Sequence, residues 1–176
     1  MYIVLGRFQP FHKGHEYLIE KALDLGEVTI AIGSGQESWT LENPWSAEER
    51  ESMIIAWLGD RHANIVQIDD INDPPNWVEH ARKIHGSGTL VTSDVNTFEL
   101  YSDSKFPVEF VELENRENLE GWRVRTTLKM LSTIGDLDAQ RAIMQESIPD
   151  KVVDWLLDND AIHRLYSISK GIEHAG

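Results

Sequence analysis

The chain has 176 residues, of which 41% are hydrophobic and 26% are charged, a balance typical of one globular domain with a sizeable core. Its formal net charge of −14 argues against binding to a nucleic acid polymer, which needs a broad basic surface. A small nucleotide is not excluded, because it needs only a local cluster of cations. The chain has no cysteine, so disulfides, thiolate catalysis and cysteine-based metal sites are excluded.

No apolar run approaches the roughly 18 residues that a membrane-spanning helix needs. The chain opens directly on a strand-like run, without the pattern of a secretory signal peptide. We therefore expect no association with a membrane and a cytoplasmic location.

Strand-like apolar runs alternate with helical patterns along the chain. The strand candidates lie at residues 2–5, 28–32, 65–68, 89–91 and 108–111. The helix candidates lie at residues 13–25, 47–58, 77–84 and 122–131, with several short ones after residue 136. This alternation predicts an α/β fold, a doubly wound, Rossmann-like parallel sheet with helices on both faces. We expect one domain over residues 1–176, with short C-terminal helices at about 136–170 packed on it.

Ligands of such sheets bind at the carboxyl ends of the strands, so the loops after the first, second, third and fifth strands are the candidate site. The first of these turns carries the sequence GRFQPFHKGH at residues 6–15. A helix N-terminus favours an anion, and two imidazoles beside free N–H groups can hold a phosphate whose charge grows during a reaction. The spacing of the histidines alone also fits two exposed polar side chains or, less readily, a zinc site.

The whole decapeptide resembles the motif of the His-X-Gly-His nucleotidylyltransferase superfamily, in the form seen in archaeal-type nicotinamide-nucleotide adenylyltransferases. The resemblance implies a single nucleotidylyltransferase domain that transfers the adenylyl group of ATP to nicotinamide mononucleotide, giving NAD and pyrophosphate. It also implies Mg²⁺ as a companion of ATP, no dedicated metal ligands in the protein, and a homo-oligomer. The residues that it implies in this turn are catalytic His12, His15 and Arg7, and ATP-binding Gly6, Phe8 and Gly14.

The loop after the second strand candidate holds small residues, Gly33-Ser34-Gly35, which permit close approach of a ligand to the backbone. A block at residues 43–50, NPWSAEER, follows it, and Ser46 with Glu49 forms a capping box. Loop and block resemble the family's Gly-Ser-Ala-Gln and Asn-Pro-Phe-Thr-X-X-Glu-Arg motifs. The resemblance implies that Gly33 and Ser34 bind the nicotinamide nucleotide and that Arg50 binds the ATP phosphates. An ion pair of Arg50 with a neighbouring glutamate stays open as the alternative.

The loop after the third strand candidate, residues 69–77, reads DDINDPPNW. It resembles the family's nicotinamide pocket, in which a Trp lies against the pyridine ring, and this implies that Asp70, Ile71 and Trp77 bind the nicotinamide nucleotide. The physics supports the idea, because a cationic ring stacks well on an indole. A purely structural Trp77 at the start of a helix is the alternative.

The fourth block, residues 119–125, reads LEGWRVR where the family has Ser-Gly-Thr-Glu-Val-Arg at the start of a helix. Gly121 and Arg125 match, which implies that they bind ATP, and an arginine there can hold phosphate oxygens bidentately. Two solvated arginines on a surface helix are the alternative.

Two of the departures from the family pattern bear on the choice of substrates: Trp122 replaces a threonine, and Glu42 stands where a basic residue commonly faces phosphate. These departures keep two other functions open. One is a different His-X-Gly-His transferase, forming FAD or a cytidylyl alcohol, and the other is a regulatory protein that binds a nucleotide without turnover.

Overall fold

The computed structural model describes residues 1–114 and 116–171. Within these residues, five strands alternate with helices along the chain. The strands are β1 (Tyr2–Gly6), β2 (Val28–Ile32), β3 (Asn64–Gln67), β4 (Thr89–Thr92) and β5 (Val108–Phe110). The α-helices are α1 (Lys13–Leu25), α2 (Ala47–Leu58), α3 (Trp77–His85), α4 (Val95–Asp103), α5 (Gly121–Leu131), α6 (Leu137–Met144), α7 (Asp150–Asp158) and α8 (His163–Ser169). Two short 3₁₀ helices, η1 (Pro74–Asn76) and η2 (Arg116–Leu119), precede α3 and α5.

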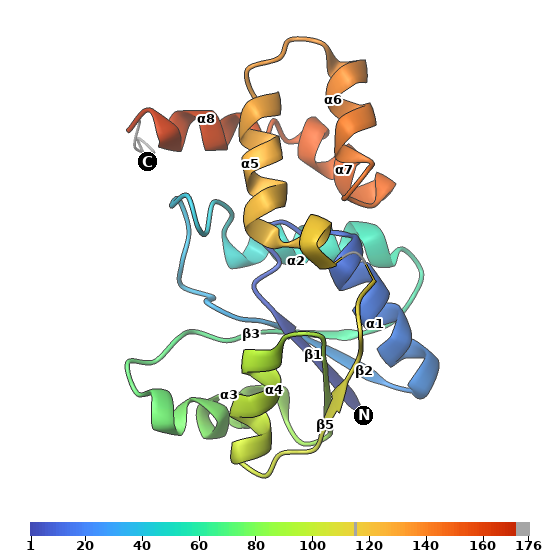
Figure 1. The fold of residues 1–176 in the computed structure, drawn as a ribbon, viewed down its shortest axis with the longest axis vertical. Coiled ribbons are helices and arrows are strands. Elements are labelled where there is room, and N and C mark those ends of the chain that lie inside the picture. Colours follow the sequence, from blue (N-terminus) through green and yellow to red (C-terminus); the bar gives the residue numbers. More distant parts are fainter. Residues whose placement is uncertain (115, 172–176) are drawn as a thin grey trace.

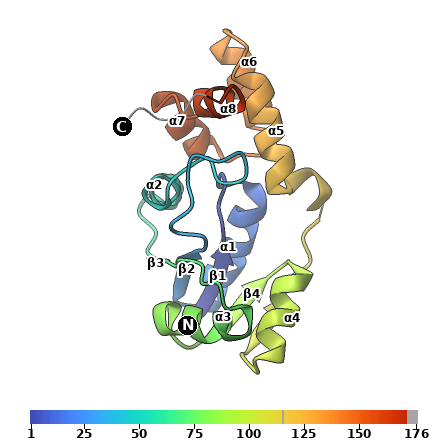
Figure 2. The same ribbon diagram turned by 90° about the vertical axis from the view of Figure 1, so that its left-hand side faces the viewer.

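All neighbouring strands are parallel, in the order β3-β2-β1-β4-β5. The chain builds outward from β1 to β3, then returns to the other side of β1 to add β4 and β5. The predicted doubly wound α/β sheet is therefore confirmed, and its switch point lies between β1 and β4, where such sheets bind ligands. Figures 1 and 2 show α3 and α4 at one end of the molecule and α5 to α8 gathered at the other.

Each face of the sheet buries alternate residues, as the pleat of a strand requires. On β1, Val4 belongs to a large cluster that includes residues of α1 and α2, whereas Ile3 belongs to a smaller one with residues of α3 and α4. Because both faces are covered, β2 is buried along its whole length. A strand that is apolar throughout is the pattern expected of a central parallel strand.

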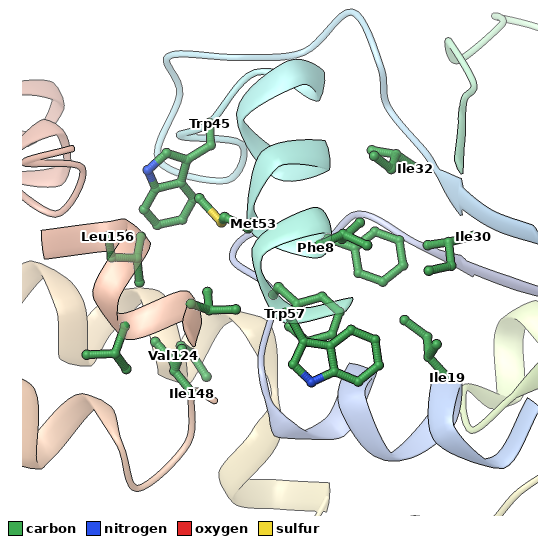
Figure 3. Packing of buried hydrophobic residues seen from close by; sticks show 14 of the residues in the cluster. Phe8, Ile19, Ile30, Ile32, Trp45, Met53, Trp57, Val124, Ile148 and Leu156 are labelled. Atoms are coloured by element: carbon green, nitrogen blue, oxygen red, sulfur yellow. The ribbon is translucent and has the colours of Figure 1, made fainter. Parts of the chain in front are cut away.

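The C-terminal helices pack on the larger cluster. α7 contacts α2, and α8 contacts α5. Figure 3 shows Leu156 of α7, Val124 of α5 and Ile148, which precedes α7, on the same side of α2 as Trp45, which precedes that helix. None of the described helices is long and apolar enough to cross a membrane.

The sequence patterns missed one described helix, α4. Its residues include Val95, Asn96, Thr97 and Ser102, which are weak helix formers, so propensity gives little signal there. Asp94 provides the start signal instead, since its side chain accepts a hydrogen bond from the backbone N–H of Thr97.

Candidate active site

A pocket of about 530 Å³ opens at the carboxyl ends of the strands, over the switch point of the sheet. The predicted site residues that line it are Gly6, Arg7, His12, Gly14, His15, Gly33, Ser34, Asp70, Trp77 and Gly121. Phe8, Arg50, Ile71 and Arg125 do not line it. The fold therefore brings together most of the residues that the sequence singled out, from loops that lie up to 115 positions apart.

The two histidines are fixed by backbone hydrogen bonds at the start of α1. His12 is the N-cap of the helix, and its Nδ1 accepts from the backbone N–H of Gly14 at 3.2 Å. The Nδ1 of His15 accepts from the backbone N–H of His12 at 3.3 Å. Because Nδ1 is the acceptor in both neutral rings, Nε2 carries the proton in both. Each ring thus keeps one N–H donor that is not used by the turn.

Both imidazoles are neutral at pH 7. Burial, followed by the positive charge of Arg125, lowers the pKa of His12 to about 4. Burial, followed by the proximity of His12, holds the pKa of His15 well below its usual value. The rings stack with centroids 3.7 Å apart, which would be costly for two cations. The pair therefore offers neutral N–H donors, which an anion can accept from.

Phe8 packs against His15 and does not line the pocket. Its side chain is fully buried, and its ring centroid lies 4.6 Å from that of His15. A Cβ on Gly6 would lie 3.2 Å from the ring of Phe8, so glycine there lets strand and ring meet closely. The expected contact of Phe8 with ATP is thus not available to its side chain.

Arg50 has a different role from the phosphate contact implied by the family motif. Its side chain is fully buried and donates four hydrogen bonds to backbone carbonyl oxygens. The acceptors are Ser46 at 3.1 Å, Arg7 at 2.9 Å, Gly33 at 2.8 Å and Ser34 at 3.0 Å. Burial lowers the pKa of Arg50 to about 10, so it stays charged at pH 7. Arg50 therefore joins the turn after β1 to the turn after β2.

Arg7 and Arg125 form the cationic part of the site. Arg7 is exposed and lines the pocket. Arg125 is partly buried, and its Nη1 donates to the carbonyl of Gln9 at 2.8 Å. Burial and then the charge of Arg7 lower the pKa of Arg125, and Glu42 opposes both. The unusual Glu42 thus lies within electrostatic reach of Arg125, and it does not line the main pocket.

The other end of the pocket is formed by Asp70 and Trp77. The indole Nε1 of Trp77 donates to Oδ1 of Asp70 at 3.3 Å, and the backbone N–H of Asp70 donates to Oε1 of Gln36 at 2.9 Å. This ties the turn after β2 to the loop after β3. In the same loop, the side-chain amide of Asn76 donates to Oδ2 of Asp73 at 2.7 Å.

The sequence patterns missed the loop after β4. Thr92, Ser93, Asp94 and Thr97 line the pocket at the end of that strand. A Ser-Asp pair directly after a buried apolar run was the available signal, because carboxyl ends of parallel strands share one edge of the sheet.

Trp122 stands at the rim of the pocket and is 54% exposed. Its Nε1 donates to Oε2 of Glu120 at 2.7 Å, and the guanidinium carbon of Arg123 lies 4.8 Å from its ring. The described residues contain no group of three or more His, Asp or Glu side chains that could enclose a metal ion.

A doubly wound sheet with a pair of histidines at its first strand-to-helix turn, lining a pocket over the switch point, fits the nucleotidyltransferase class. The chain belongs to the cytidylyltransferase-like family, whose model matches residues 3–127.

Relatives in archaea carry a more specific name. A nicotinamide-nucleotide adenylyltransferase of Methanococcus vannielii is 36% identical over 92% of this chain and 91% of its own length. The protein of the same name from Thermoplasma acidophilum is 32% identical over 94% of this chain and 90% of its own length. The sequence resemblance to archaeal-type nicotinamide-nucleotide adenylyltransferases is therefore confirmed.

Solved structures share the fold. A bifunctional NMN adenylyltransferase/ADP ribose pyrophosphatase of Francisella tularensis superposes with a TM-score of 0.69 at 21% identity, over 97% of this chain. This chain spans about half of that protein, 52% of its length. A Plasmodium falciparum nicotinic acid mononucleotide adenylyltransferase gives a TM-score of 0.60 at 12% identity, over 92% of this chain and 96% of that one.

The role of Arg50 can be tested by substitution. We expect Arg50→Met to lower the free energy of unfolding by at least about 3 kcal/mol, since each buried carbonyl left without a partner costs about 1–3 kcal/mol. Urea unfolding of both proteins measures the difference. Arg82→Met on the exposed side of α3 is the control and should change stability by less than about 0.5 kcal/mol. Equal effects of the two substitutions would contradict the role given to Arg50.

The low pKa of His12 predicts a loss of stability in acid. The unfolded chain binds a proton on this residue near pH 6.5, whereas the folded chain does so only near pH 4. Unfolding therefore takes up a proton between these values, and stability should fall as the pH drops through this window. In His12→Asn the amide can still cap α1. Unfolding titrations at pH 7, 6 and 5 should show a shallower decline for the variant, and identical slopes would refute the assignment.

Proposed function

We propose that this chain transfers the adenylyl group of ATP to nicotinamide mononucleotide, forming NAD and pyrophosphate. The observation that carries the proposal is the neutral pair His12 and His15 in the same pocket as Trp77 and Asp70. A phosphate-binding turn and an aromatic platform in one pocket suit the two ends of a mononucleotide. The archaeal relatives that are named for this activity support the same choice of substrates.

The reaction needs no nucleophile from the protein. An oxygen of the mononucleotide phosphate attacks the α-phosphorus of ATP in line and forms the new P–O bond. The bond from the α-phosphorus to the oxygen that bridges it to the β-phosphorus breaks, and its electron pair leaves with pyrophosphate. Catalysis of such a step consists of positioning and of charge stabilisation.

The residues at the first turn are suited to stabilise this charge. In the proposed complex, the Nε2–H groups of His15 and His12 donate to oxygens around the α-phosphorus, where negative charge develops. Preorganised donors in a partly buried site are worth more than the same donors in water. Arg7 and Arg125 attract the outer phosphates, and Gly6, Gly14 and Gly121 let the chain of phosphates approach the backbone.

The Trp77 end of the pocket would receive the nicotinamide ring. The positively charged pyridinium stacks on the indole, and the carboxylate of Asp70, held by the same indole, faces the cation and its carboxamide. Gly33 and Ser34, which line the pocket beside it, complete the nicotinamide nucleotide site. Ile71 lies outside the pocket lining, so its contribution is limited to shaping the loop.

ATP is proposed to bind as its magnesium complex, with the ion held by phosphate oxygens and water, which Mg²⁺ readily retains. A homo-oligomer, a cytoplasmic location and the absence of nucleic acid partners stay predictions. Light scattering of the purified protein tests the first, and cell fractionation tests the second.

The direct test mixes the purified protein with ATP, Mg²⁺ and one acceptor at a time. We expect NAD and pyrophosphate with nicotinamide mononucleotide. Nicotinic acid mononucleotide, flavin mononucleotide and, with CTP, glycerol 3-phosphate are the comparison acceptors. Pyrophosphate release that requires one of these instead would replace the proposed substrate, and tight nucleotide binding without any product would point to a regulatory protein.

His15→Ala should lower the turnover number at least about a hundredfold while ATP still binds. The reason is that its hydrogen bond strengthens as charge develops in the transition state. NAD formation and equilibrium binding of ATP measure the two properties separately. His62→Ala, at an exposed loop position, is the control. A folded His15→Ala protein with near-normal turnover would rule out the catalytic role.

Trp77→Ala should weaken the binding of nicotinamide mononucleotide by about 1–2 kcal/mol, the value of a stacked cation–π contact, and affect ATP much less. Trp77→Phe keeps an aromatic face and should recover most of the affinity. Binding measured separately for each substrate decides the matter. Equal losses for both substrates would indicate that Trp77 only supports the start of α3.

A further inference from the structure

The family model matches this chain only as far as residue 127, so the C-terminal helices lie outside the match. These helices and the turns between them nevertheless form hydrogen bonds with the loops of the site. The side chain of Lys13, at the first turn of α1, donates to the carbonyl of Gln145 at 2.7 Å. The indole Nε1 of Trp45 donates to the carbonyl of Ala161 at 3.3 Å. Figure 3 shows Trp45, which precedes α2, near Leu156 of α7. The strongest of these attachments is made by Arg164 of α8.

Arg164 forms a bidentate ion pair with Glu49. Its Nη2 donates to Oε1 of Glu49 at 2.5 Å, and its Nη1 donates to Oε2 of the same carboxylate and to the carbonyl of Pro44. The guanidinium carbon also lies 4.3 Å from the ring of Trp39. The side chains of Arg164 and Glu49 are only 16% and 28% exposed, so water screens this pair far less than a surface pair.

Glu49 links the ion pair with Arg164 to the start of α2 and, through the next residue, to the site. Its Oε2 accepts the backbone N–H of Ser46 at 2.8 Å and so closes the capping box at the start of α2. The next residue is Arg50, whose buried guanidinium holds the carbonyls of Arg7 and Gly33. The ion pair thus fixes the helical turn that sets the phosphate-binding turn against its neighbour.

The same helix also reaches the surroundings of Arg125. Leu165, which follows Arg164, lines a hollow of about 200 Å³ together with Leu41 and Arg125. The segment held by Arg164, residues 39–46, therefore leads directly to the cationic side of the site. None of these hydrogen bonds is made by the side chain of His12 or His15.

We infer that Arg164 is a positioning residue for the donor nucleotide. By clamping residues 39–46 and the first turn of α2, it holds Arg7 and Arg125 where they meet the outer phosphates. The naming of the nucleotide as ATP rests on the proposed function. Loss of the clamp should weaken ATP binding more than it slows the chemical step, since the donors at the α-phosphorus stay in place.

Equilibrium binding of ATP without any acceptor, together with steady-state kinetics, tests this inference. We expect Arg164→Met to raise the dissociation constant and the Michaelis constant for ATP about tenfold, a typical coupling for residues in one network, with the turnover number changed less than about threefold. Glu49→Gln should behave alike, and the double variant should be no worse than either single one. Arg164→Lys should weaken ATP binding almost as much as Arg164→Met, because an ammonium cannot form the bidentate pair with Glu49 or stack on Trp39.

The chain offers a matched control. Arg141 of α6 pairs with Asp154 of α7 at 2.5 Å, in the same C-terminal unit, with side chains 40% and 43% exposed. Arg141→Met should leave ATP binding within about twofold of the unchanged protein, and melting temperatures show whether both variants fold. Glu49→Gln and Arg164→Lys carry the test if Arg164→Met does not fold.

Two results would overturn the inference: ATP binding within about twofold of normal in all folded variants of Arg164 and Glu49, or an equal loss in Arg141→Met. A turnover number that falls while ATP affinity is unchanged would also contradict it. If the protein forms no NAD and yet the variants bind ATP about tenfold less tightly, the proposed function fails and the role of Arg164 stands.

Discussion

The buried guanidinium of Arg50 is the constraint on which the site depends. Its hydrogen bonds join the turn after β1 to the turn after β2 and to the start of α2. A planar cation with five donors can satisfy several carbonyl oxygens at once, which no neutral side chain does as well. The cost of burying its charge is offset only while all these acceptors are in place, so the arrangement is cooperative.

This rigidity explains how a protein with net charge −14 can prepare a site for polyanions. The cations at the pocket are few, and His12 and His15, which line it, are neutral. In the proposed complex, attraction would come from Arg7 and Arg125, whereas orientation would come from N–H groups that are locked by the fold. Separating these two tasks keeps like charges from crowding one turn, which would destabilise the empty site.

Sequence patterns predicted what is local and missed what is long-range. The buried strands and the turn with His12 and His15 were predictable, because apolar runs and a helix start depend on neighbouring residues. The role of Arg50 was not, since three of its four partners lie 16 to 43 positions away. Arg164 gave no signal at all, because its partner Glu49 is 115 positions distant. The site residues themselves stay predictions, with Phe8 and Arg50 moved from ligand contact to support.

The tautomers of the two histidines have a consequence for proton balance. Each ring enters the binding reaction without a proton on Nδ1, and a phosphate brought within reach raises the pKa of an imidazole. Any proton that the bound nucleotide recruits to these rings must come from the solvent, and it returns there when the product leaves. The heat of nucleotide binding should accordingly depend on the ionisation enthalpy of the buffer. The number of protons bound by the two imidazoles would then change each time the ligand binds or leaves.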